Sequence, residues 1–470
     1  MHSFALTSIT DPETGSLSDS LFCIADGQVL ICTLDHEAKT VPRRIDLPGS
    51  ANRLAYSPHL RSLIVAYTRT EYDTESDPIR RYTRPCIEFV DPDSQQSVVD
   101  ILEAPQSEPR PWRPQGTAGE KISCILDWTP KKGDEEYHMI VIGTARKNQP
   151  DRGRVIFLQA SWSPSNPTQI ECTVKYIHKF EGPVYSIAPY GDFTLIVCTG
   201  HEIVPLEPKS SQTRWVRAAR FPVLSPAMSI TTQEPYVYVS ASRESLMVLK
   251  AVDDRLVLHA FDRQKHDGLS HIHLDGEMKL TLASSRGGRV SILTEEGVAD
   301  NDKVMPMALC EAHLPSSVMK LASSSSRSAL SPASRVYYGT AMNGTVYSFL
   351  TLGEKEWRLL HLLQDLCVRD PVVCPFSPKR KQQRHPVGHE PLDFRPSQMH
   401  INGDILARLV PHGSSRLTQM LMGESSSPDT TSHGEAWTKF NELSTAVLGE
   451  EVSPVDAVLG WLKKILHVEF

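Results

Sequence analysis

The stretch YHMIVIGT (Tyr137–Thr144), followed by GRVIFLQ (Gly153–Gln159), gives the clearest indication of the fold of this chain. Both segments are short apolar runs rich in the β-branched residues that strands favour. A basic, polar linker, Ala145–Arg152, separates them. The pair is therefore predicted to form an antiparallel hairpin.

Runs of this kind recur at intervals of roughly ten to fifteen residues from about residue 20 to residue 360, divided by Gly, Pro, Asp, Asn and Ser. Leu21–Ile24 and Gln28–Leu34 flank an Asp-Gly turn, which predicts another hairpin. The segments SRGG (Ser285–Gly288) and TAMNG (Thr340–Gly344) are also typical hairpin turns. The polar stretch Arg69–Tyr82 is predicted to be an exposed loop.

The strand count suffices for about seven four-stranded sheets of roughly 40–50 residues each, which is the repeat length of propeller blades. The predicted fold is therefore all-β, a seven-bladed β-propeller followed by a small α-helical C-terminal domain. A double sandwich of sheets is the alternative. No Trp-Asp dipeptide marks each blade.

Helical periodicity replaces the strand pattern near the C-terminus. Trp357–Leu366 is predicted to be a helix that leaves the last blade, and Asp370–Pro396 contains six prolines and is predicted to be a linker. In Asn402-Gly403-Asp404, we expect Gly403 to permit an unusual backbone angle and Asp404 to cap a helix over Ile405–Val410.

Two further helices follow. Trp437, Phe440, Ser444 and Val447 share one face of the first. The second begins with Ser453 as N-cap and Pro454 at the first position, and its apolar stripe is predicted to pack on the propeller. That stripe consists of Val455, Val458, Leu459, Leu462, Ile465 and Leu466. The predicted domains are 1–360 (propeller), 361–398 (linker) and 399–470 (helical domain).

The composition is that of a soluble globular protein, with 40% hydrophobic and 22% charged residues. The net charge of −7 opposes nucleic-acid binding over the whole surface. No apolar run reaches the length that spans a bilayer, and the first residues lack the features of a signal peptide. The nine cysteines are scattered, which predicts reduced thiols in the cytosol or nucleus.

No motif predicts catalysis, and we expect no catalytic residue and no cofactor. The acidic run Asp134–Glu136 is predicted to be a solvated turn, and G-x-S-x-G, S-x-x-K, phosphate-loop and dinucleotide-binding motifs are absent. Cys367 and Cys374, with His385 and His389, are spaced too loosely for a typical zinc site. His271 and His273 share a strand face and are predicted to be exposed histidines without a metal.

Propellers bind partners through the loops on one face and around the centre. Trp215, Arg243 and Arg263 are residue types enriched at interface hot spots and are predicted to contact a partner. The basic run Lys379-Arg380-Lys381 is a candidate nuclear-import or nucleic-acid patch, with a solvated linker as the alternative.

Several blocks, in this order, resemble one family of propeller scaffolds, which includes damaged-DNA-binding, cleavage-and-polyadenylation and splicing factors. The blocks are DGQVLICTLD (26–35), LPGSANRLAYSPHLRSLIVA (47–66), YHMIVIGTARKNQPDRGRVIFLQ (137–159), FEGPVYSIAPYGDFTLIVCTGHEIVPLE (180–207), RVYYGTAMNGTVYSFL (335–350) and MHINGDILARL (399–409).

The resemblance implies the last propeller of the family and its helical domain. It also implies a non-catalytic, protein-binding scaffold subunit of a nuclear complex, acting in DNA repair as a ubiquitin-ligase adaptor or in mRNA processing. Members of the family carry three propellers, and this sequence has room for one. The alternative is a subunit of such a complex that contacts RNA or DNA through the basic linker and Ala145–Arg152. The expected location is the nucleus, with the cytoplasm as a second compartment.

Overall fold

The structure is a computed structural model of residues 1–470. It describes residues 3–11, 15–25, 28–33, 45–47, 49–73, 78–92, 97–100, 119–132, 135–146, 152–164, 170–208, 215–217, 219–253, 255–262, 266–275, 279–294, 299–300, 303–304, 307–327, 335–375, 395–422, 431–450 and 453–466. The chain divides into two compact units, Met1–Pro48 and Gly49–Phe470.

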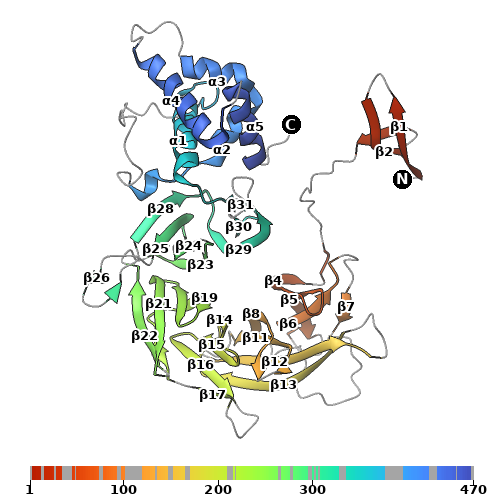
Figure 1. Ribbon diagram of the computed structural model, residues 1–470. Coiled ribbons are helices and arrows are strands. Elements are labelled where there is room, and N and C mark those ends of the chain that lie inside the picture. Colours follow the sequence, from red (N-terminus) through yellow and green to blue (C-terminus); the bar gives the residue numbers. More distant parts are fainter. Residues whose placement is uncertain are drawn as a thin grey trace. The chain divides into compact units, whose positions relative to one another are not determined.

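The first unit contains one antiparallel sheet with the order β1-β2-β3 (Figure 1). Its strands are β1 (Ser3–Asp11), β2 (Gly15–Ala25) and β3 (Gln28–Thr33). Strands β2 and β3 pair with Ala25 opposite Gln28, which confirms the predicted hairpin. Strand β1 was not predicted from the sequence.

In the second unit, the strands between residues 50 and 349 form six main sheets, which we number as blades one to six (Figure 1). Blade one consists of β4 (Ser50–Ser57), β5 (Ser62–Asp73), β6 (Arg80–Val90) and β7 (Ser97–Asp100), and blade two of β8 (Glu120–Trp128), β11 (Met139–Arg146), β12 (Arg152–Trp162) and β13 (Ile170–Phe180). Blade three consists of β14 (Ser186–Tyr190), β15 (Thr194–Cys198), β16 (Glu202–Pro208), β17 (Trp215–Arg217) and β18 (Phe221–Pro222), and blade four of β19 (Ala227–Gln233), β20 (Tyr236–Ala241), β21 (Ser245–Val252) and β22 (Arg255–Phe261). Blade five consists of β23 (Gly268–His273), β24 (Leu280–Ser285), β25 (Arg289–Thr294) and β28 (Met307–His313), and blade six of β29 (Val318–Arg327), β30 (Arg335–Ala341) and β31 (Val346–Phe349).

Short strands complete these sheets. β26 (Ala299–Asp300) and β27 (Lys303–Val304) extend the outer edge of blade four, and β9 (Lys131–Lys132) pairs with β10 (Glu135–Glu136).

The first strands of the blades contact one another in chain order: β4 with β8, β8 with β14, β14 with β19, β19 with β23 and β23 with β29. Five separate apolar clusters fill the interfaces between consecutive blades. Each buried Val, Leu or Ile in such a cluster contributes about 1.5–3 kcal/mol. This arrangement is a β-propeller, and the double-sandwich alternative is wrong.

The predicted hairpin of Tyr137–Thr144 and Gly153–Gln159 is present as β11 and β12. These strands pair from Ile140 opposite Leu158 to Arg146 opposite Arg152. Gly143 lies in the middle of β11 because a side chain there would collide with Cys124 Sγ and Val184 Cγ1. Gly339 has the corresponding place in β30, where a Cβ would lie 2.8 Å from Val318 Cγ1. Close packing of strands, rather than a turn, therefore explains the repeated Gly-Thr-Ala of the sequence.

The predicted loop Arg69–Tyr82 is mostly strand, so this prediction was wrong. β5 and β6 pair from Leu63 opposite Val90 out to Asp73 opposite Arg80. The side chains of Arg69, Thr70 and Tyr72 are exposed. A polar sequence thus marked an exposed strand pair.

The helical domain is built of α1 (Glu354–Arg369), α2 (Gly403–Leu409), α3 (Gly413–Met422), α4 (Thr431–Leu448) and α5 (Pro454–Leu466), with short 3-10 turns η2 (Pro396–Gln398) and η3 (Val410–His412). All five helices lie together (Figure 1), and they share a single apolar cluster. Phe440 is fully buried in it and Ser444 is 2% exposed, as the predicted face of α4 requires. Helix α1 crosses the predicted domain boundary at residue 360. None of the described helices combines the length and the apolar character needed to cross a bilayer.

Three details of this domain differ from the predictions. The cap of α2 is Asn402, whose side chain accepts a hydrogen bond of 3.0 Å from the Asp404 backbone N–H. A Cβ on Gly403 would lie 3.3 Å from Leu466 Cδ2, so the glycine allows close approach of α5. The stripe of α5 is buried, but it packs on α2, α3 and α4 rather than on the propeller.

One buried ion pair ties α1 to α3. Arg416 Nη2 lies 2.5 Å from Asp370 Oδ2, and Asp370 Oδ1 accepts hydrogen bonds from the backbone N–H groups of Val372 and Val373. Burial opposes ionisation of Asp370, yet the bonds from Arg416 and the backbone lower its pKa overall. The carboxylate therefore ends α1 and anchors the chain that follows it.

Candidate functional site

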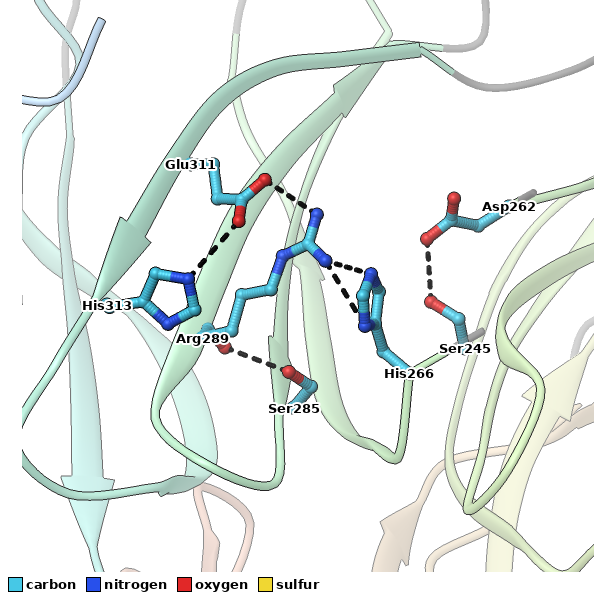
Figure 2. Close-up of polar contacts among 7 residues, drawn as sticks. All are labelled: Ser245, Asp262, His266, Ser285, Arg289, Glu311 and His313. Carbon is cyan, nitrogen blue, oxygen red and sulfur yellow. Dashed lines mark hydrogen bonds and ion pairs between the residues drawn. The ribbon is translucent and has the colours of Figure 1, made fainter. Parts of the chain in front are cut away.

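The loop ends of blades four and five carry a set of connected polar contacts. Because the strands of a blade alternate in direction, the β20–β21 turn and the β24–β25 turn lie at the same end. The connection from β22 to β23 starts and finishes at that end too. Seven residues of this region form what we call the Arg289 cluster: Ser245, Asp262, His266, Ser285, Arg289, Glu311 and His313 (Figure 2).

Arg289, the first residue of β25, is the centre of the cluster. Its Nη1 reaches both ring nitrogens of His266, with Nδ1 at 3.1 Å, and its Nη2 donates to Glu311 Oε2 at 2.7 Å. Glu311 Oε1 lies 3.4 Å from His313 Nε2. The guanidinium thus joins β25 and β28 to the connection that arrives from blade four (Figure 2).

Electrostatics keep the His266 ring neutral. Burial lowers its pKa, and the neighbouring Arg289 lowers it further, against the opposing effects of Asp262, Glu311 and Asp267. A neutral imidazole can accept a hydrogen bond from the guanidinium. Arg289 and Glu311 then compensate each other's charge with side chains only 11% and 18% exposed.

Ser245 fixes the neighbouring turn. Its Oγ donates to Asp262 Oδ2 at 2.7 Å, and its backbone N–H donates to the His266 carbonyl at 2.9 Å. The residue has φ of +60°, a region that few non-glycine residues occupy. These two bonds hold this backbone and therefore the turn that presents Arg243.

A small cavity lies beside the cluster. It has about 10 Å³ of space, which suits a single water molecule rather than a substrate. Serines dominate its walls: Ser240, Ser245, Ser284, Ser285 and Ser291. The contacts pair Ser245 with Asp262 and His266 with Arg289, and this differs from the serine–histidine–aspartate relay of a hydrolase. The cluster therefore joins the loops at this end of blades four and five.

A second serine–histidine–aspartate set occurs at the opposite end of blades one and two. His138 Nε2 lies 2.6 Å from Asp127 Oδ1 and 3.4 Å from Ser57 Oγ. A catalytic triad places the aspartate on the other ring nitrogen, Nδ1. Here Nδ1 faces the Ala160 carbonyl at 3.4 Å, so the set joins strands. Among the described residues, no group of three His, Cys, Asp or Glu side chains suits a metal ion.

The structure separates the predicted contact residues. Arg243 is exposed in the β20–β21 turn, next to the Arg289 cluster, and its backbone N–H donates to Ser225 Oγ at 3.1 Å. Trp215 begins β17 at the opposite end of the sheets, where its ring centroid lies 4.7 Å from that of Phe157 and 5.7 Å from that of Phe193. Its half-buried ring thus packs within its own chain. Arg263, Lys379, Arg380 and Lys381 lie outside the described residues, as do His385 and His389.

The prediction that His271 and His273 are exposed was wrong. His271 is 3% exposed, and His273 is half-buried. Both Nε2 atoms lie 2.8 Å from Thr231 Oγ1, and Ser240 Oγ lies 2.8 Å from His271 Nδ1. Burial lowers the pKa of His271 to about 3 and that of His273 to about 4. The pair therefore links blades four and five as neutral rings.

Seven cysteines of the second unit are free thiols that are buried or half-buried: Cys86, Cys124, Cys172, Cys198, Cys310, Cys367 and Cys374. Burial raises the pKa of Cys124, Cys172 and Cys198 to about 12, so these thiols stay protonated. Cys367 and Cys374 lie in the apolar cluster of the helical domain.

Sequence reasoning missed the Arg289 cluster. Its residues come from four strands and one connection, and no spacing in the sequence joins them. The one available signal was the hairpin SRGGR, in which Gly287 and Gly288 have positive φ and Arg289 follows directly. On its own, that segment predicts only a turn.

Comparison with known proteins gives one family. The family model described as the CPSF A subunit region matches residues 113–410. A curated relative, an uncharacterized protein of Schizosaccharomyces pombe, is 30% identical over 166 residues, which cover 34% of this chain. The matched segment spans 15% of the length of that relative.

Proposed function

Because the chain belongs to the CPSF A subunit region family, we propose that it is a non-catalytic scaffold subunit that binds other proteins of a nuclear complex. The complex would act in mRNA cleavage and polyadenylation or, as a damaged-DNA-binding, ubiquitin-ligase-adaptor-like assembly, in DNA repair. The fold and the family support a scaffold in a multi-subunit complex, and the choice of complex is the finer part of the proposal.

The observation that carries the proposal is the closed charge network of the Arg289 cluster. Arg289 is bonded to His266 on one side and to Glu311 on the other, and the adjacent cavity has room for one water molecule. Such a network does not process a substrate. It holds the loop end of two blades rigid, and preorganisation lowers the entropic cost of binding a protein.

Arg243 is the proposed contact at this end, and Trp215 is a proposed contact at the opposite end of the sheets. Arg263, which lies outside the described residues, remains a proposed contact as well. Arginine and tryptophan are enriched among hot-spot residues. Lys379, Arg380 and Lys381 remain the proposed import or nucleic-acid patch. The nucleus is the proposed location, with the cytoplasm as a second compartment.

The seven-bladed ring and the division into 1–360, 361–398 and 399–470 also stay proposals. Exposed apolar side chains on the outermost blades of the series support a further blade: Leu54 is 65% exposed on blade one, and Val346 is 62% exposed on blade six. Under the proposed division, the sheet β1-β2-β3 belongs to the propeller.

Affinity capture of the full chain at physiological salt, followed by mass spectrometry, tests the scaffold function. We expect a stable set of co-purifying proteins that includes subunits of one nuclear complex. The variant R243E/R263E should lose at least one of them, whereas R255E, which changes an exposed arginine on β22, should lose none. Recovery of no stable macromolecular partner would contradict the proposal.

One observation favours nucleic acid as an alternative ligand. The hairpin of β11 and β12 ends in Arg146 and the exposed Arg152, which border the proposed contact loop 147–151. Binding through phosphates weakens steeply with added salt. Titration of a labelled single-stranded RNA at increasing salt tests this alternative, and salt-independent or undetectable binding would remove it.

A further inference from the structure

The face of blade two that packs on blade one becomes basic at the end of the sheet where β11 finishes and β12 begins. Ile142, Ile156 and Ile177 pair across this face, and they pack in the apolar cluster shared with blade one. Because side chains alternate along a strand, every second residue toward that end lies on the same face. The residues placed there are one carboxylate, one threonine and four cations: Glu120, Thr144, Arg146, Arg152, Arg154 and Lys179.

Strand pairing sets these cations directly opposite one another. Arg146 on β11 is opposite Arg152 on β12, and Arg154 on β12 is opposite Lys179 on β13. Residues that face each other across an antiparallel pair have Cβ atoms about 5 Å apart, and like charges in such positions repel. One face of the sheet thus holds two neighbouring pairs of like charges.

Glu120 compensates one of the four cations. Its Oε1 accepts hydrogen bonds from Arg154 Nε at 2.8 Å and from Thr144 Oγ1 at 2.7 Å, and its Oε2 contacts Arg154 Nη2. The side chain of Glu120 is only 3% exposed. Its carboxylate is therefore engaged by Arg154 and holds that guanidinium in place.

The other three cations form no ion pair with a described carboxylate. Arg152 and Lys179 are exposed, and Arg146 is half-buried. The Nε–H of Arg146 is shielded from solvent and has no hydrogen-bond partner in the described part of the chain. A shielded donor without an acceptor costs free energy, which a bound anion would recover. Glu181, the exposed acid just after β13, forms no described ion pair with any of the three cations.

We infer that Arg146, Arg152 and Lys179 bind the phosphate group of a phosphorylated serine or threonine in a partner protein. Guanidinium groups match phosphate oxygens with two parallel hydrogen bonds. A phosphorylated side chain carries about two negative charges at neutral pH and three acceptor oxygens, enough for three cationic donors. The inference rests on the proposed scaffold function and names the chemistry of one partner segment.

The arrangement favours a phosphorylated side chain over a nucleic acid. The three cations lie on two neighbouring rows of one sheet face, which suits a single anion better than a backbone of many phosphates. The described residues of these rows include no aromatic side chain, whereas proteins bind single-stranded nucleic acids by stacking bases on aromatic rings. The net charge of −7 also repels a long polyanion.

Fluorescence anisotropy of the full chain with a labelled phosphoserine peptide tests the site. The probe is a short peptide of alanine and glycine with one central phosphoserine, so that the phosphate supplies the main contacts. We expect saturable binding that R146Q weakens about tenfold and R146Q/R152Q weakens further, because each lost charge-assisted bond is worth about a factor of ten. R146K should keep part of the binding, since lysine keeps the charge but loses the paired hydrogen bonds.

R255Q is the matched control, because it changes an exposed arginine on β22 of blade four, and it should bind the peptide as the wild-type chain does. The same peptide with unphosphorylated serine should not bind. R146Q removes a cation opposite Arg152, so its thermal midpoint should equal or exceed that of the wild-type chain. An intact thermal midpoint separates lost binding from lost folding.

Equal peptide binding by the wild-type chain and R146Q/R152Q would overturn the inference. Equal binding of the phosphorylated and unphosphorylated peptides, or stronger displacement of the probe by single-stranded RNA than by unlabelled peptide, would overturn it too. A rise in thermal midpoint with inorganic phosphate but no binding of the peptide would identify a free anion as the ligand and contradict it. Capture of partners that survives both R146Q/R152Q and phosphatase treatment would refute this site and leave the scaffold function intact.

Discussion

The blades and the helical domain differ in how their apolar cores are divided. Five apolar clusters divide the blade region, and each of them joins two neighbouring blades. One cluster serves all five helices of the C-terminal domain. Neutral histidines and charge networks supplement the apolar contacts between blades, and the ion pair Asp370–Arg416 supplements them between helices.

Because of this difference, we expect a destabilising substitution to have different consequences in the blades and in the helical domain. In a series of blades, each unit packs mainly on its neighbours, so the loss of one contact is local. In the helical domain every helix shares the same core, so the loss of one large side chain affects all of them. The predictions below test this contrast, beginning with the largest effect.

Phe440→Ala removes a fully buried ring from the shared core of the helices. We expect a loss of about 3–5 kcal/mol, enough to unfold the helical domain before the blades. Urea unfolding followed by circular dichroism should show the helical transition moving to lower denaturant. Thr445→Ala, at an exposed position of the same helix, is the control, and equal midpoints for both variants would contradict the single-core description.

Lowering the pH should weaken the contact between blades four and five. The folded His271 has a pKa of about 3, whereas the unfolded chain binds a proton near the usual 6.5. The stability that neutral His271 supplies is therefore present above pH 6.5 and is lost as the pH falls toward 3.

For His271, this loss amounts to about 2 kcal/mol between pH 7 and pH 5. Urea unfolding of the blades at the two pH values measures it. His271→Gln, which keeps a hydrogen-bonding side chain but cannot titrate, should make the pH dependence shallower. An unchanged pH dependence would show that the histidine is not buried as described.

Gly143→Ala tests the close packing of β11 against its neighbours. A new methyl group would collide with Cys124 and Val184, and overpacking of this kind costs about 1–3 kcal/mol. We expect a lower thermal midpoint for the blades with little change in the helical transition. Gly191→Ala, in an open turn with positive φ, separates backbone strain from crowding, since nothing lies within 4 Å of its Cβ position.

Asn402→Ala gives the smallest expected effect. It removes the side-chain acceptor for the Asp404 N–H at the start of α2, which costs about 1 kcal/mol. Thermal unfolding should show a small decrease for the helical domain, and Asn402→Asp should preserve stability because a carboxylate also caps. A larger loss for Asp404→Ala than for Asn402→Ala would restore Asp404 as the cap.

Local patterns predicted much of the fold. The β11–β12 hairpin, the turns at SRGG and TAMNG, the face of α4 and the start of α5 at Pro454 are where periodicity and turn chemistry place them. Polarity failed for Arg69–Asp73, because an exposed hairpin and a loop have the same composition. Among the described residues at or beside the Arg289 cluster, Arg243 is the only one that the sequence predicted to be a contact residue.

The sequence by itself determined that short strands alternate with tight turns and that a helical segment follows, because these features depend on residues close together in the chain. Only the tertiary structure decided which side chains meet. Hydrogen bonds and burial join residues from different strands and blades, so Arg289 finds His266 and Glu311, and His271 becomes a buried neutral ring instead of an exposed one.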